Sequence, residues 1–297
     1  MNVSKPSEKY KLLKQRRATW MAIVIKDFRK SKHGIVGSVI VVMIFLMALM
    51  APIIAPGNPQ QPNYGMELLP PSIEFPFGTD NIGRSVFHFV VWGTRNELLI
   101  GLVATLIAMT IGTLVGAFAG YYGGIIDMIL MRITDAVAVI PIFFLLIIGV
   151  SMFQTKSLWL IASIIGIVTW PYFARIVRSE FVSLKERTYV LAAKSIGASD
   201  FRIIFRHILP NAAGSIIVTA TIYVAYAILL EAGLSFLGLG DPTATTWGIM
   251  LNTGRDLLRR APWVATFPGL FIFLTSWGFN LLGDGLRDAL AIRERKG

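Results

Sequence analysis

Cysteine is absent from this chain of 297 residues, and only three histidines occur. The lack of cysteine excludes disulfides, thiol catalysis and thiolate metal sites. His33, His88 and His207 lie far apart and lack the HExxH spacing of a zinc site, so no metal site is expected. No Gly-Lys dipeptide occurs, which excludes the P-loop that binds nucleotide phosphates. The sequence therefore predicts a chain that is not an enzyme and binds no cofactor of its own.

Charged residues are also scarce, at 15% of the chain against about 25% in soluble domains, while 55% of the residues are hydrophobic. A hydrocarbon core about 30 Å thick is crossed by about 20 helical residues. Apolar runs of that length predict an all-α integral membrane protein with six transmembrane helices. The expected spans are 34–55, 98–120, 135–153, 158–176, 212–232 and 264–283.

The basic residues predict the orientation of these spans. With the N-terminus in the cytoplasm, 22 of the 28 Lys and Arg residues fall in cytoplasmic segments and six fall outside. Both termini are therefore expected in the cytoplasm of a multi-pass protein of the cell (inner or plasma) membrane. The net charge of +11 is attributed to these flanking cations and not to nucleic-acid binding, because no basic and aromatic stripe lies on a soluble domain.

The chain divides into a cytoplasmic basic segment 1–33, a transmembrane domain 34–290 and a cytoplasmic tail 291–297. The first apolar run follows about 30 residues of basic leader and is longer than a signal-peptide core, so it is interpreted as a retained anchor. The leader mixes cations with large apolar residues. A helix that lies on the membrane surface and a disordered basic tail both fit that composition.

A cytoplasmic loop, 179–210, lies between the fourth and fifth spans and carries strong helix signals. Ser183 and Glu186 match a capping box. Good helix formers then continue to Gly197, a residue that commonly ends a helix. The pattern predicts a helix over 184–196.

A second helix is expected to begin at Ser199 or Asp200 and to end at Pro210, because proline cannot continue a helical hydrogen-bond ladder. Small residues surround the bend between the two helices and would let another protein approach its backbone: Ala192, Ala193, Gly197 and Ala198. An ordinary interfacial linker helix is the alternative interpretation of this loop.

The same loop resembles the signature of ABC importer permeases, which reads Glu-Ala-Ala, three residues, Gly, nine residues, Ile-x-Leu-Pro. The matching positions are Ala192, Ala193, Gly197, Leu209 and Pro210. Leu191 stands where that family usually has Glu, and His207 stands where it has Ile. FRHILPN is nevertheless a common form of this segment in the dipeptide and oligopeptide branch.

Further motifs resemble the second (C-type) permease subunit of dipeptide and oligopeptide importers. Ser85 replaces an Asp of that pattern, and the tail AIRERKG departs from the usual Asp-Pro-Arg. The motifs are GTDNIGRSVF at 78–87, LSFLGLG at 234–240, TTWGIML at 245–251, APW with FPG at 261–269, and FNLLGDGLRDAL at 279–290.

The resemblance implies the fold of a type I ABC importer permease, with a cytoplasmic coupling helix. It implies a heterodimer with a second homologous permease, two ABC ATPase subunits that use ATP and Mg²⁺, an extracytoplasmic substrate-binding protein and the lipid bilayer as partners. Peptides are the expected substrate, with oligosaccharides or nickel chelates as alternatives. The residues expected to couple to the ATPases are Leu191, Ala192, Ala193, Lys194, Gly197, Ala198, Ser199, Asp200 and Pro210.

Ionisable residues inside spans indicate function when they line a cavity or a relay. Asp135, Glu231 and Asp284 lie toward span ends and form no midplane chain, which disfavours the other class considered, a proton-coupled secondary transporter. Polar residues that could line a translocation path, or equally join helices to one another, are Thr219, Tyr223, Tyr226 and Asn280.

The segment 57–97 is rich in proline near its start and is expected to be an ordered external loop. Asp80 and Arg84 are its candidate contacts with a substrate-binding protein. A cover over the partner permease is the alternative role for this loop.

Overall fold

The computed structural model describes residues 27–294, with side chains described through residue 290. Most of the predicted segment 1–33 therefore lies outside the described residues. Residues 27–294 contain no β-strand, only an isolated bridge between Thr79 and Ser85. The helices are α2 (Lys32–Ile54), α3 (Val86–Tyr122), α4 (Gly124–Val139), α5 (Ile142–Ser151), α6 (Leu158–Lys185), α7 (Thr188–Ser195), α8 (Asp200–Arg202), the π-helix η1 (Ile203–Ile208), α9 (Leu209–Phe236), α10 (Trp247–Arg255) and α11 (Trp263–Glu294).

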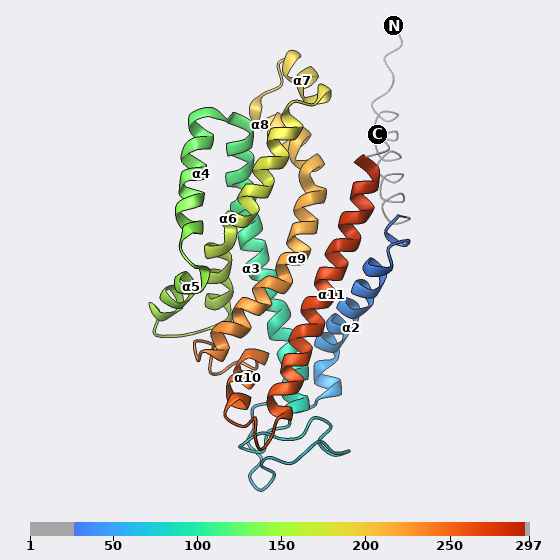
Figure 1. The fold of residues 1–297 in the computed structure, drawn as a ribbon, viewed down its shortest axis with the longest axis vertical. Coiled ribbons are helices and arrows are strands. Elements are labelled where there is room, and N and C mark those ends of the chain that lie inside the picture. Colours follow the sequence, from blue (N-terminus) through green and yellow to red (C-terminus); the bar gives the residue numbers. More distant parts are fainter. Residues whose placement is uncertain (1–26, 295–297) are drawn as a thin grey trace.

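The long helices run from one end of the molecule to the other (Figure 1). One end carries α7 and is called the α7 end below. The opposite end carries α10 and the long loop that precedes α3, and it is called the α10 end.

Five of the described helices are long and apolar enough to cross a membrane, and a sixth span is possible if a bent pair is counted as one. The single helices α2, α3, α6, α9 and α11 confirm five of the expected spans, with α8 and η1 extending α9 toward the α7 end.

The expected third span, 135–153, is wrong as a continuous helix. It is replaced by α4 and α5, which meet at an angle of 82°. Ile140 takes an extended conformation, with ψ at 129°, since the residue before a proline is disfavoured from helical geometry, and Pro141 then caps α5. The helix α4 also starts earlier than expected, at Gly124. Its first turns were not recognised in the sequence because Asp127, Arg132 and Asp135 interrupt the apolar run.

Glycines bring α3 and α6 into close contact. An added Cβ would lie 2.4 Å from Phe173 Cβ at Gly112, and 2.4 Å from the Ala174 carbonyl oxygen at Gly116. At Gly120 it would lie 2.6 Å from Phe181 Cβ. This spacing of four residues places the three glycines on one face, so the two backbones pack directly against each other, as small residues allow between membrane helices.

Candidate functional site

The helix α7 is short, at eight residues, and projects from the α7 end of the molecule (Figure 1). The predicted helix 184–196 is wrong in its start. The preceding span α6 continues to Lys185, and Arg187 caps α7 without a side-chain hydrogen bond. Ser183 and Glu186 therefore form no capping box, since extending an existing helix by a turn costs less than nucleating a new one.

The predicted end of this helix at Gly197 is confirmed. Gly197 has φ of +79°, a conformation that only glycine adopts without strain. Its N–H donates to the Lys194 carbonyl at 3.0 Å, and the Ala198 N–H donates to the Ala193 carbonyl at 3.1 Å. These two bonds are a Schellman motif, which satisfies the last carbonyls of α7 and turns the chain sharply back.

The residues predicted to couple to an ATPase divide between two sides of α7. Ala193 is buried with Val190 against η1 and the end of α6. Large apolar groups are exposed around the bend, with Ile196 at 86% and Phe201 at 71% of full exposure. Among the predicted residues, Ala198 is half-buried, and the exposed ones are Leu191, Ala192, Lys194, Gly197, Ser199, Asp200 and Pro210.

Pro210 does not end the second helix, contrary to the prediction. Asp200–Phe236 forms a continuous helix of 37 residues that passes through it. The π-helical turn η1 ends two residues before the proline, and the Leu209 N–H donates to the Ile204 carbonyl five residues back. This change of hydrogen-bond register accommodates Pro210, which has no N–H to donate, without ending the helix. The Asn211 side-chain amide donates to the His207 carbonyl at 2.6 Å, which satisfies a group that the change of helical register exposes.

A cavity of about 550 Å³ lies between α4, α5, α6, α9 and α11. Its wall includes the break at Pro141. Three of the four predicted path residues line it, namely Tyr223, Tyr226 and Asn280. Thr219 does not line it; that side chain is nearly buried and donates to the Ser215 carbonyl at 2.8 Å.

Polar groups that the sequence pattern did not single out complete this cavity. Tyr172 stacks on Tyr223 with ring centroids 6.1 Å apart. Arg175 lines the wall and forms an ion pair with Asp135 of α4 at 2.9 Å, with both side chains about half exposed. Pro141, within an apolar run, is a further sequence signal for an irregular wall here.

Two buried glutamates lie at the α10 end, and one of them, Glu97, joins two helices. The Glu97 carboxylate of α3 accepts the backbone N–H of Trp247, at the start of α10, at 2.9 Å. Glu231 of α9 accepts the Ser235 hydroxyl at 2.6 Å. Both side chains are fully buried. Glu97 was missed because it was assigned to the external loop 57–97, whereas the helix α3 already begins at Val86.

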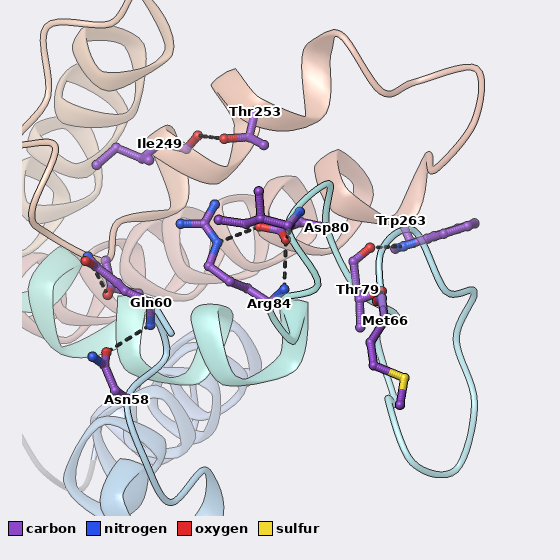
Figure 2. Close-up of polar contacts among 11 residues, drawn as sticks. Asn58, Gln60, Met66, Thr79, Asp80, Arg84, Ile249, Thr253 and Trp263 are labelled. Atoms are coloured by element: carbon purple, nitrogen blue, oxygen red, sulfur yellow. Dashed lines mark hydrogen bonds and ion pairs between the residues drawn. The ribbon is translucent and has the colours of Figure 1, made fainter. Parts of the chain in front are cut away.

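The loop before α3 is ordered by its own polar contacts (Figure 2). Asp80 is fully buried, accepts from Arg84 Nε at 2.6 Å, and accepts the backbone N–H groups of Ile82 and Arg84. Thr79 donates to the Met66 carbonyl, and its own carbonyl accepts from Trp263 Nε1. Asp80 therefore presents no carboxylate at the surface, contrary to the predicted external contact, and most of the Arg84 side chain is also covered.

Comparison with known proteins identifies the family to which this chain is similar. Residues 112–296 match the family described as "binding-protein-dependent transport system inner membrane component", and residues 19–71 match the N-terminal transmembrane domain of oligopeptide transport permease C. The chain is 41% identical over 266 residues to the dipeptide transport system permease protein DppC of Alkalihalophilus pseudofirmus, covering 89% of this chain and 87% of that protein. It is 40% identical over 287 residues to the oligopeptide transport system permease protein OppC of Bacillus subtilis, covering 96% and 93%.

A solved structure supports the same fold. A chain of the MetNI methionine ABC transporter, in an inward-facing conformation, aligns with a TM-score of 0.53 and 19% identity, covering 69% of this chain and 96% of that chain. At this identity the likeness shows the fold alone, that of a type I ABC permease. The resemblance noted in the loop 179–210 and in the later motifs is confirmed: this chain belongs to the binding-protein-dependent transport system inner membrane components, in the dipeptide and oligopeptide permease branch of C type.

Proposed function

We propose that this chain is the C-type permease subunit of an ATP-driven importer of peptides. It forms half of the translocation path beside a second, homologous permease and receives motion from two separate ATPase subunits through α7. An extracytoplasmic binding protein delivers the substrate. The observation that carries the proposal is the close likeness, over nearly the whole chain, to relatives named as dipeptide and oligopeptide permeases. A further relative, 41% identical over 267 residues, is named as a glutathione permease of Escherichia coli.

The cavity supports the peptide proposal. Its volume of about 550 Å³ lies within the range of about 300–1,000 Å³ usual for small-molecule sites. Tyrosine rings and Asn280 offer both apolar faces and hydrogen-bonding groups, and Arg175 adds a cation, which pairs with Asp135 of α4 outside the lining. A peptide has matching apolar side chains, amides and a terminal carboxylate.

The orientation in this proposal places the α7 end and both termini in the cytoplasm. The excess of Lys and Arg in the segments assigned to that side supports it. In this orientation the exposed apolar groups Ile196 and Phe201 face the motor subunits. Hydrolysis of ATP, with Mg²⁺, is performed by those subunits and not by this chain, which has no Gly-Lys dipeptide and hence no P-loop.

Uptake of labelled peptide into proteoliposomes tests the proposal. The complete transporter is reconstituted with its binding protein, and uptake is measured with ATP, without ATP, with vanadate, and with an uncoupler that collapses the proton gradient. We expect uptake to require ATP and to stop with vanadate, and we expect the uncoupler to leave it unchanged. Uptake that needs the proton gradient and no ATP would establish a secondary transporter instead. Uptake of an oligosaccharide or a nickel chelate in preference to every peptide tested would refute the substrate assignment alone.

A further inference from the structure

Both chain segments that flank α7 are hydrogen-bonded to the last turn of α3. Before α7, the Lys185 ammonium donates to the Gly120 carbonyl at 2.9 Å. After α7, the Tyr121 hydroxyl donates to the Asp200 carboxylate at 2.6 Å. The covalent chain connects α7 only to α6 and to the helix that becomes α9, so these two bonds add a third connection, to α3.

We propose that Tyr121 is a positioning residue for α7, and that its bond to Asp200 makes α3 move with α7 when the ATPases displace it. The inference rests on the proposed function and assigns Asp200 a role within this chain. The sequence had placed Asp200 at the contact with an ATPase. Its carboxylate instead accepts from a tyrosine of α3.

The packing around this bond makes it a mechanical connection between stiff elements. Tyr121 lies at the edge of an apolar cluster in which Ala117 of α3 meets Val190 of α7 and Ile203 of η1. At Gly120, a Cβ would lie 2.7 Å from the Arg178 carbonyl of α6, so α3 and α6 are in backbone contact here. A short O–H···O⁻ bond is charge-assisted and stronger than a bond between neutral groups. A displacement of α7 therefore reaches α3 through packed side chains and a directional bond.

The far end of α3 explains why this connection would matter for transport. The helix runs unbroken for 37 residues, from Val86 to Tyr122. Near its other end it carries Glu97, which accepts the first backbone N–H of α10. Since a packed helix without a break moves as a unit, a shift at Tyr121 is carried to the α10 end, where substrate enters in the proposed orientation.

The alternative is that Tyr121 and Asp200 form a surface hydrogen bond with no effect on transport. The two possibilities differ in the number of peptides transported per ATP hydrolysed, because a contact that only stabilises the fold does not change that ratio. Tyr122 provides a matched control. It is the adjacent tyrosine, 45% exposed, and its hydroxyl makes no hydrogen bond among the described residues.

The experiment compares Tyr121→Phe with Tyr122→Phe in the complete transporter in proteoliposomes, measuring uptake and ATP hydrolysis together. We expect Tyr121→Phe to keep substrate-stimulated ATP hydrolysis and to lower peptides transported per ATP at least about fivefold, the lower end of the coupling usual between linked sites. Tyr122→Phe should match the unmodified protein. Asp200→Ala should reproduce the loss, and the double variant Tyr121→Phe with Asp200→Ala should lose no more than either single variant, since both remove one interaction.

Asp200→Asn keeps the test decisive if Tyr121→Phe assembles poorly. Its amide oxygen still accepts from the tyrosine, so we expect a number of peptides transported per ATP between those of the unmodified protein and Asp200→Ala. An unchanged ratio in Tyr121→Phe, or additive losses in the double variant, would overturn the inference. A failure of the unmodified transporter to import peptide with ATP would instead refute the proposed function.

Discussion

Neighbouring alanines on α7 provide a sharp test of which side of the helix faces a partner. Ala193 has 6% of its surface exposed and packs inward, whereas Ala192 is exposed. The substitutions Ala193→Leu and Ala192→Leu add the same atoms one residue apart. Extra methylene groups in a packed site cost about 1–3 kcal/mol, whereas a surface change stays within about 0.5 kcal/mol.

We therefore expect Ala193→Leu to lower the melting temperature of the purified transporter, by roughly 2 to 10 °C, and to displace α7. Ala192→Leu should leave the melting temperature unchanged. It should nevertheless reduce substrate-stimulated ATP hydrolysis and uptake, because the added side chain stands on the surface that we propose meets the ATPase. Thermal unfolding followed by tryptophan fluorescence, together with the proteoliposome assay, separates the two effects.

The opposite pattern in the two variants would contradict this assignment of the two sides of α7. If Ala193→Leu unfolds like the unmodified protein while Ala192→Leu is destabilised, the assignment of the buried side is wrong. If Ala192→Leu is stable and transports normally, the exposed side of α7 is not the surface that contacts the motor. A conservative exchange of Ala192 for Ser adds little volume and should behave as the unmodified protein in both assays.

Three further predictions concern glycines and the loop at the α10 end. Gly197→Ala should weaken the turn after α7 by about 1–2 kcal/mol, because alanine is strained at a positive φ, although nothing lies within 4 Å of the added Cβ. Gly197→Asn should lower transport less, because asparagine tolerates a positive φ. Gly116→Val should abolish folded protein in the membrane, measured by size-exclusion chromatography after extraction, whereas Gly269→Ala, with its nearest neighbour 3.8 Å away, should be tolerated. Asp80→Ala should leave Arg84 unpaired and make the loop over residues 55–85 more sensitive to protease, and wild-type cleavage rates would contradict the role of this pair.

Much of the fold could be predicted because most spans are uninterrupted apolar runs, whose length alone indicates a crossing. The run 135–153 has that length too, yet Pro141 breaks it. Composition averages over such a break, and only the conformational restriction on the residue before proline reveals it. The start of α4 was missed for a related reason. Asp127 pairs with Arg178 of α6, but the local sequence shows only an unpaired charge, which is typical of a loop outside a span.

The candidate site was predictable only in part, because its residues come from several helices. Tyr223, Tyr226 and Asn280 stand out locally as polar groups in apolar spans. Arg175 was counted as a flanking cation, since the sequence does not record that its partner is Asp135 of α4. The motif around Gly197 was recognisable because the left-handed turn that ends a helix strongly favours glycine.

The error at Pro210 bears on how α7 can transmit motion. A helix that ended at the proline would connect α7 to the membrane through a hinge, and a hinge absorbs displacement. The π-turn over Ile203–Ile208 allows the helix to continue instead, so Asp200–Phe236 forms one element about 55 Å long at 1.5 Å per residue, as does α3. Both exceed the roughly 30 Å of a hydrocarbon core and extend beyond it as helix. With Tyr121 bonded to Asp200 at 2.6 Å, the two extensions are joined beside α7. A displacement of α7 then tilts two long helices together, past the break between α4 and α5 at Pro141 in the cavity wall.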